Sequence, residues 1–183
     1  MGRPLFWVLS FVAGLSACAS VDRPGEGRLV LPASPSPRVL SETALRCFEG
    51  QAPTANGAER PLVTALLSPR MVYSLLEWPR MQREAEAAGY RVQAWRDPRV
   101  PLGEWQQAWA SPAMHGWNGP LPQALPEACV AEWGPVNHVP LVRVVWMGRL
   151  HPWPAWGIMD REAWLATLAL RRNGLADAME AAK

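Results

Sequence analysis

The chain has 183 residues, of which 49% are hydrophobic and 19% are charged, and its formal net charge is +2. This composition is typical of one globular domain with processing or linker segments, and it argues against a disordered chain. The small net charge, without any run of basic residues, gives no support to nucleic-acid binding. Eleven tryptophans and nineteen prolines are unusual for this length, and tryptophan serves either a core or a contact surface.

The N-terminus has the pattern of a bacterial lipoprotein signal peptide over residues 1–17. Arg3 supplies a positive charge, and the apolar run that follows is too short to cross a bilayer comfortably as a helix. The run ends in Leu15-Ser16-Ala17-Cys18. This end resembles the lipobox, in which the cysteine is acylated and becomes the first residue of the mature protein. An ordinary signal peptide with a cysteine near its end is the alternative interpretation.

Acylation of Cys18 makes the membrane a partner of the protein, because several acyl chains on one residue give stable anchoring. Ala19 follows where lipoproteins of the inner membrane commonly have aspartate. The resemblance therefore implies an outer-membrane lipoprotein whose domain faces the periplasm. We interpret residues 18–40, rich in proline, serine and glycine, as the lipidated cysteine and a flexible tether. The folded domain is expected over 41–183.

The first half of the domain alternates between helical and extended patterns. Ser41 is a candidate N-cap for the first helix. Pro79 should kink the second helix, because proline removes a helical hydrogen bond, and Gly89 should end it. In chain order we expect a helix, a buried strand, a second helix and a second strand over 41–48, 61–67, 72–88 and 90–95.

The second half begins with a region rich in proline and tryptophan, in which short helices are expected over 103–110 and 123–133. Gly148 should form a turn between an alternating strand and its antiparallel partner, over 141–147 and 149–158. A last helix is expected over 160–172, with Asp160 as its N-cap and Asn173-Gly174 at its end. This order predicts an α/β fold with helices on the faces of a mixed sheet.

The stretch Ser68-Pro69-Arg70-Met71-Val72-Tyr73-Ser74 lies between the first buried strand and the second helix. It resembles the active-site turn of the thioredoxin fold, whose periplasmic members often read Ser-Pro-x-Cys-Pro-Tyr-Cys. Met71 and Ser74 fall at the two cysteine positions, with Val72 and Tyr73 between them. In that family the helix N-terminus lowers the pKa of the first cysteine and yields a reactive thiolate.

Three further positions fit the same family frame. Pro79 follows Ser74 by five residues, as the proline that kinks the family's helix does. Pro140 precedes the strand over 141–147, where the family has a cis-proline beside the active site, and Gly148 follows it by eight residues. The resemblance implies a thioredoxin-like mixed sheet flanked by helices, with a Pro/Trp-rich insertion at about 97–135 before the cis-proline strand.

The redox chemistry of that family requires two thiols, and neither Met71 nor Ser74 supplies one. Ala65 stands where many members carry a buried acid that handles protons. We therefore expect no dithiol oxidoreductase activity at this turn and no catalytic residues. No cofactor or metal is expected, because the three histidines lack the spacing of metal ligands. Ser74 as a nucleophile with His138 as its base is a minor alternative, without an acid to orient the histidine.

Cys47 and Cys129 are the two cysteines that remain after Cys18. In an oxidising periplasm an even pair is typical of a structural disulfide. Two other interpretations stay open: a pair of independent buried thiols, or a thiol-disulfide oxidoreductase or isomerase that uses Cys47 or Cys129.

Aromatic side chains in the proline-rich loops are a further lead to function. Such residues are enriched in protein interfaces, and proline holds them with little entropy left to lose. Packing against the domain's own sheet is the alternative, and stacking on carbohydrate is a third. The residues of this candidate interaction surface are His138, Trp105, Trp109, Trp117, Trp153 and Trp156.

These features together predict a non-catalytic thioredoxin-like lipoprotein of the periplasm that acts as a protein-interaction or envelope-assembly module. Its groove, formed by the turn and the cis-proline, would hold an extended peptide of an envelope partner by strand-like hydrogen bonds. Degenerate thioredoxin folds of this kind are similar to those of conjugative-transfer and other envelope-assembly systems, an analogy of fold alone. A thiol-disulfide enzyme and a purely structural lipoprotein are the alternatives.

Overall fold

The sheet is built around β2, the buried strand that the sequence predicts before the turn. The computed structural model describes residues 35–50, 60–112, 114, 117 and 120–183. All six residues of β2 are buried, as expected for a strand with both faces covered. The elements in chain order are β1 (Arg38–Val39), α1 (Glu42–Glu49), β2 (Leu62–Leu67), α2 (Val72–Ala87), β3 (Arg91–Arg96), α3 (Leu102–Trp109), β4 (Gln123–Ala124), the 3₁₀ helix η2 (Glu127–Cys129), α4 (Val130–Trp133), β5 (Leu141–Trp146), β6 (Arg149–Leu150), β7 (Ala155–Trp156) and α5 (Arg161–Glu180).

The strands lie in the order β1-β6-β5-β2-β3-β4, and β7 also pairs with β5. Strand β2 runs parallel to β3 and antiparallel to β5, and β5 continues into antiparallel β6. The turn between β5 and β6 consists of Met147 and Gly148, which both have positive φ, as in the tight turns that match the twist of the strands. A βαβ unit beside an antiparallel ββα unit is the thioredoxin-like arrangement, so the predicted fold class is confirmed.

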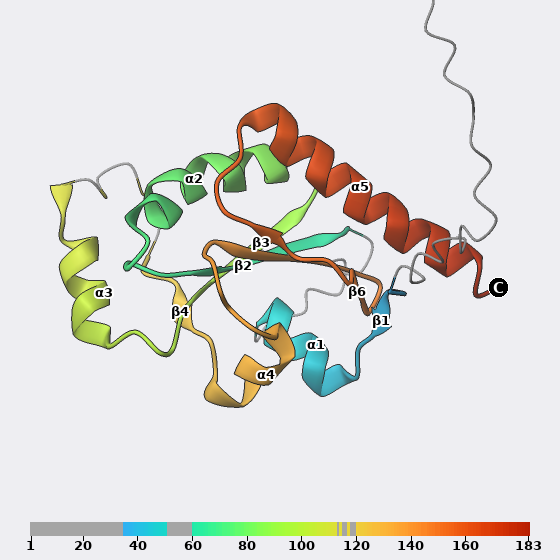
Figure 1. Ribbon diagram of the computed structural model, residues 1–183, viewed down its shortest axis with the longest axis horizontal. Helices are drawn as coiled ribbons and strands as arrows, with labels where there is room; N and C mark the ends of the chain where they lie inside the picture. Colours follow the sequence, from blue (N-terminus) through green and yellow to red (C-terminus); the bar gives the residue numbers. More distant parts are fainter. Residues whose placement is uncertain (1–34, 51–59, 113, 115–116, 118–119) are drawn as a thin grey trace, which may run out of the picture. The chain divides into compact units, whose positions relative to one another are not determined.

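Helices cover the two faces of the sheet as separate layers, with α2 and α5 on one face and α1 and α4 on the other (Figure 1). Alternate residues of a strand point to opposite faces. Val63 and Val144 therefore join the core beneath α2 and α5, where Trp78 and Trp164 are fully buried. On the other face, β2 and β5 contribute Leu62, Leu66, Leu141 and Val145 to a second core with Phe48, Trp95 and Trp133.

The predicted boundaries of the early elements agree with the structure to within one or two residues. The Ser41 hydroxyl accepts a hydrogen bond from the Ala44 N–H at 3.2 Å and caps α1. Pro79 lies inside α2, and Gly89 follows that helix with a positive φ of 88°. The predicted tether ends too late, however, because β1 lies within it and pairs with β6. Leu40 is also buried, and its N–H donates to the Gly148 carbonyl oxygen at 2.8 Å.

The helix predicted over 123–133 is wrong in its first part. Gln123 and Ala124 form β4, which pairs in parallel with the end of β3. Helical structure begins only at Glu127, after Pro126, because the residue that precedes a proline is driven away from the helical conformation. The insertion predicted at about 97–135 thus contains α3, β4, η2 and α4.

The end predicted for the last helix is also wrong, since α5 continues through Asn173-Gly174 to Glu180. Leu175 is fully buried and extends the apolar face beyond the glycine. A Cβ at Gly174 would lie 3.3 Å from Nε2 of His151, so this glycine allows a close approach and does not end the helix. The return strand predicted over 149–158 is split into β6 and β7, with two prolines that lack an N–H between them.

Candidate functional site

The turn between β2 and α2 presents different residues to solvent and to the core. The N–H of Met71 donates to the Ser68 carbonyl oxygen at 3.2 Å, and the N–H of Ser74 donates to the Met71 carbonyl oxygen at 2.7 Å. Met71 and Tyr73 are 48% and 64% exposed, and Val72 is also exposed, whereas Ser74 is only 1% exposed. The turn therefore offers an apolar surface at the start of α2.

The Ser74 hydroxyl is bound to the backbone of the turn itself. It donates to the Ser68 carbonyl oxygen at 2.9 Å and lies 3.4 Å from the Ser68 N–H, which donates to it. Its proton is thus engaged with a backbone carbonyl rather than with an imidazole. His138, the base of the nucleophile alternative, lies exposed on the loop before Pro140. At Ser74 the geometry is that of a structural hydrogen bond that closes the turn.

The loop that precedes β5 lies beside this turn, because β5 pairs with β2 from Leu66 onward. The Val139–Pro140 peptide bond is cis, the isomer that the family resemblance implies. The Pro140 carbonyl oxygen accepts a hydrogen bond from the Gly157 N–H at 3.1 Å. Among the described residues, neither the N–H nor the C=O of Val139 has a hydrogen-bond partner. An extended peptide placed alongside would find an unused backbone donor and acceptor there.

A cavity of about 360 Å³ lies between the turn, the end of β3 and this loop. Parallel strands β2 and β3 end at the same edge of the sheet, and the crevice at such an edge is a common ligand site in α/β proteins. The residues that line it are Ser68, Arg70, Met71, Asp97, Arg99, Val100, Val136, Asn137, His138 and Val139.

Arg70, Asp97 and Arg99 contribute charged groups to the cavity wall, and each arginine is paired with a carboxylate. Arg70 Nε and Nη2 donate to Glu104 at 3.0 and 2.9 Å. Arg99 Nε and Nη2 donate to Asp97 at 2.8 and 2.7 Å, and the Arg99 backbone N–H also donates to Asp97 at 3.0 Å. Burial of Asp97 opposes its ionisation. The hydrogen bonds from Arg99 and the charges of Arg99 and Arg70 outweigh that effect and hold the pKa of Asp97 below its usual value.

The sequence reasoning missed these charged residues. The signal that points to them is their position, since Asp97-Pro98-Arg99 directly follows β3 and Arg70 lies three residues after the end of β2. The Asp97 N–H donates to the Leu67 carbonyl oxygen at 3.0 Å, so the two strand ends lie side by side. Glu104 has no comparable signal, because it reaches Arg70 only once α3 folds back toward the turn.

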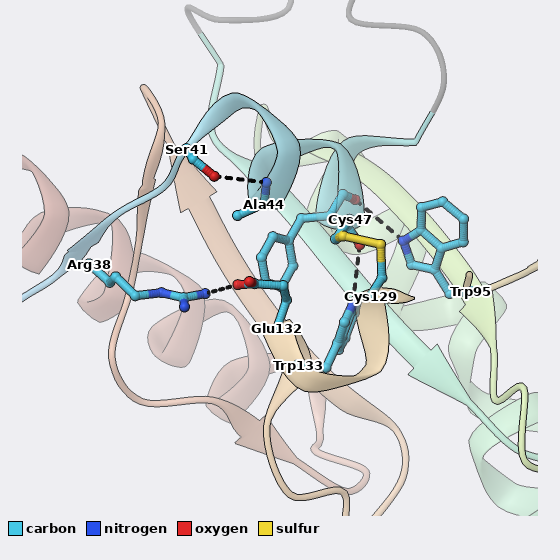
Figure 2. The surroundings of a disulfide bond; sticks show 9 residues. Arg38, Ser41, Ala44, Cys47, Trp95, Cys129, Glu132 and Trp133 are labelled. Atoms are coloured by element: carbon cyan, nitrogen blue, oxygen red, sulfur yellow. Dashed lines mark hydrogen bonds and ion pairs between the residues drawn. A yellow bond between two sulfur atoms is a disulfide. The ribbon is translucent and has the colours of Figure 1, made fainter. Parts of the chain in front are cut away.

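Cys47 and Cys129 form a disulfide whose sulfur atoms are 1.99 Å apart, with a sequence separation of 82. The bridge joins α1 to η2, and Figure 2 shows it with the indoles whose N–H groups point at α1. The Trp133 indole donates to the Cys47 carbonyl oxygen at 3.1 Å, and the Trp95 indole donates to the Phe48 carbonyl oxygen at 3.3 Å. These bonds satisfy carbonyl groups that the end of a helix leaves unpaired.

The disulfide also borders a cavity of its own. This second cavity has a volume of about 950 Å³ and is lined by α1, by Trp95 and by the segment from β4 to α4. Cys47 and Cys129 are both among its lining residues, although both are buried. It lies on the α1 face of the sheet, whereas the first cavity lies at the strand ends.

The tryptophans of the predicted interaction surface divide between core and surface. The prediction is wrong for Trp105, which is fully buried, because the short helix α3 packs this residue into the core. Trp109 and Trp117 are partly buried against the same core. Their rings contact each other edge to face, with centroids 4.8 Å apart.

Trp153 and Trp156 remain exposed, at 52% and 47%. Two arginines donate hydrogen bonds to the loop that carries Trp153. Arg171 Nη2 donates to the Pro154 carbonyl oxygen at 2.9 Å, and Arg143 Nη1 donates to the Pro152 carbonyl oxygen at 3.5 Å. Trp153 is therefore an exposed aromatic side chain on a well-supported loop.

Cys18 lies outside the described residues. Within the described ranges, no group of three His, Cys, Asp or Glu residues is placed to hold a metal ion. No helix there combines the length and apolar character needed to cross a membrane.

No protein-family model and no curated protein sequence matches the chain. Two chains of solved structures match. One is the pneumococcal exposed lipoprotein thioredoxin Etrx1 from Streptococcus pneumoniae strain TIGR4. It is 15% identical, the alignment covers 63% of this chain and 87% of that chain, and the TM-score is 0.48. At this level of similarity the thioredoxin-like assignment depends on the strand order and pairing described above.

Proposed function

We propose that the chain is a redox-inactive thioredoxin-like module that binds an extended segment of an envelope protein. The observation that carries this proposal is which side chains the turn between β2 and α2 exposes and which it binds. Methionine is exposed where the redox family presents a thiolate, and the Ser74 hydroxyl is bound to the Ser68 backbone. The apolar surface at the turn and the unused backbone of Val139 support binding of a peptide without any thiol exchange.

The test is site-specific photo-crosslinking in the cell envelope, with p-benzoylphenylalanine in place of Met71. We expect discrete adducts, because this side chain lines the cavity. The matched control places the same group at Leu170, which is 68% exposed on α5. The same adducts from both positions, or none from Met71, would contradict the proposal. Reduction of insulin by the purified chain would contradict its redox-inactive part.

A thiol-disulfide oxidoreductase or isomerase that uses Cys47 or Cys129 is the second candidate function. The observation in its favour is that both cysteines line the cavity of about 950 Å³. A catalytic disulfide must exchange with an external thiolate. The second candidate therefore predicts insulin-reductase activity that is lost in the Cys47→Ser variant, whereas the first predicts no activity in either protein.

For the location, we propose an outer-membrane lipoprotein that is acylated at Cys18 and faces the periplasm. The lipobox-like stretch that ends at Cys18 supports this proposal. Cells that express the chain should incorporate radiolabelled palmitate into it, and the Cys18→Ser variant should not be labelled. Equal labelling of the two proteins would contradict acylation at this residue.

A further inference from the structure

The cavity at the strand ends carries more positive than negative charge in its wall. Arg70 and Arg99 line it, and Asp97 contributes one carboxylate. Glu104, the partner of Arg70, is not among the lining residues. Glu104 nevertheless binds Arg70 at 2.9 and 3.0 Å and offsets its charge, so an anionic group in the cavity would be bound through the remaining N–H donors of the two arginines rather than through a net positive charge.

Each guanidinium is held in place by a carboxylate and still has hydrogen-bond capacity. Arginine carries five N–H donors in a rigid fork. Arg70 and Arg99 each use Nε and one hydrogen of Nη2 on their own carboxylate. Within the described part of the chain, neither Nη1 group has a hydrogen-bond acceptor. A second carboxylate would meet donors whose orientation is already fixed, so little further entropy is lost on binding.

The unused backbone of Val139 forms part of the same wall. A peptide that pairs with this backbone is extended, and its side chains alternate between the two sides of the strand. One of those side chains therefore faces the cavity. Its methylene groups would contact Met71 and Val100, and its terminal group would reach the arginines.

We propose that the cavity binds the carboxylate of a glutamate or aspartate side chain in the bound peptide, with Arg70 and Arg99 as the residues that determine this specificity. The inference rests on the proposed function, because it names the class of peptide that the groove selects. A lysine at the same peptide position would meet like charge, and a glutamine would lose the charge-assisted hydrogen bonds.

The test uses the ¹⁵N-labelled full chain and the peptide acetyl-Ser-Val-Ser-X-Ser-Val-Ser-amide, with X as Glu, Gln or Lys. Titration followed by NMR gives the dissociation constants and identifies the residues that respond. We expect the Glu peptide to bind about tenfold more tightly than the Gln peptide, as a charge-assisted hydrogen bond implies. It should shift the Val139 amide and the Nε–H resonances of Arg70 and Arg99.

Arg70→Gln should remove most of the preference for Glu, and Arg99→Lys, which keeps the charge but loses the fork, should reduce it. Arg46→Gln is the matched control. Arg46 also pairs with a glutamate, Glu42, and its side chain is 69% exposed against 59% for Arg70. Both arginines lie at the surface, so neither glutamine variant should unfold the chain. The control should keep the full preference.

Three outcomes would overturn parts of this scheme. Equal affinity for the Glu and Gln peptides, with shifts at Val139, rejects the acidic specificity and leaves the peptide groove intact. A preference for Glu that survives in both Arg70→Gln and Arg99→Lys rejects the assigned site. Absence of any shift at Val139 with all three peptides rejects the groove and the specificity together.

Discussion

The two faces of the central sheet are covered in different ways. On one face lie α2 and α5, with 16 and 20 residues. On the other lie α1, η2 and α4, with 8, 3 and 4 residues. Long helices bury an apolar side over several turns, whereas helices this short are not stable alone. The second face is instead tied together by a disulfide and by hydrogen bonds from side chains to helix ends.

This difference also bears on the candidate site, because the loop that leads to Val139 begins at the face covered by α1, η2 and α4. Trp133 ends α4, and its carbonyl oxygen accepts a hydrogen bond from the buried Arg143. The next residues, 134–139, lead to the cis-proline and line the cavity with four side chains. The disulfide thus lies on the face from which this loop begins.

The largest effect is expected from loss of the bridge. The double variant Cys47→Ala/Cys129→Ala opens a loop whose ends are 82 residues apart in sequence. The chain-entropy model gives a loss of about 4.5 kcal/mol in the free energy of unfolding. Urea unfolding followed by tryptophan fluorescence measures it.

Amide hydrogen exchange in the same variant tests whether the disulfide stabilises one face of the sheet more than the other. Amides of α1 and α4 should exchange much faster, while those of α5 should be protected nearly to the reduced global stability. The wild-type chain with dithiothreitol should behave like the variant, and the variant itself should not respond to dithiothreitol. Equal acceleration on both faces would show that the disulfide does not act locally.

A smaller loss is expected from a cavity on the face covered by long helices. Leu168 of α5 is fully buried, and Leu168→Ala should lower the free energy of unfolding by about 3 kcal/mol. This loss should affect exchange from α2 and α5 first. Leu170→Ala is the matched control in the same helix, because Leu170 is exposed, and it should change stability by less than about 0.5 kcal/mol.

Adjacent residues of the turn provide a third, smaller contrast. Ser74→Ala leaves the buried N–H of Ser68 without a partner, and the Ser68 C=O keeps only the Met71 N–H, which should cost about 1–2 kcal/mol. Tyr73→Ala removes an exposed ring and should leave stability almost unchanged. If Tyr73 belongs to a binding surface, only its variant should weaken the crosslinks formed at Met71. A neutral Ser74→Ala would mean that the hydroxyl does not hold the turn.

The sequence predicts the fold well where local patterns and packing agree. The strand before the turn is apolar and β5 is largely so, Ser41 and Asp160 are capping residues, and all of these hold in the structure. The sequence pattern misleads where a contact between residues far apart in the sequence determines the local structure. Gly174 looks like a helix end, but the space it leaves is occupied by His151. Gln123 looks helical, but β3 offers it a parallel partner.

The candidate site is predicted only in part for a similar reason. The turn and Pro140 are found because a family motif fixes their spacing. The pair of Arg70 and Glu104 is not found, because it depends on two segments that meet only in the folded chain, whereas Asp97 and Arg99 are two residues apart and form no recognised motif. Arg70 and Glu104 are 34 residues apart, and no short motif connects them. The prediction for Trp105 fails because a tryptophan in a proline-rich region has the same local sequence pattern whether it faces the core or solvent.

The smallest effect concerns His151, which directly follows β6 and is buried. Its Nδ1 lies 3.2 Å from the Trp153 N–H that donates to it, and its ring contacts α5 at Gly174. Burial lowers the pKa of His151, the Trp153 carbonyl oxygen opposes this effect, and the Arg171 charge adds to it, so the net pKa lies below the ordinary value. As the pH falls below about 6.5, the unfolded chain therefore takes up a proton before the folded chain does.

It follows that this part of the stability is present above about pH 6.5 and is lost as the pH falls toward the lower pKa of the folded state. The slope is at most about 1.4 kcal/mol per pH unit. Urea unfolding of the wild type and of His151→Gln at several pH values between 5 and 7 measures it, and the difference between the two curves isolates His151 from the carboxylates. The difference should shrink with decreasing pH, because only the wild type loses stability through this residue. A constant difference would mean that the loop between β6 and β7 does not depend on a neutral histidine.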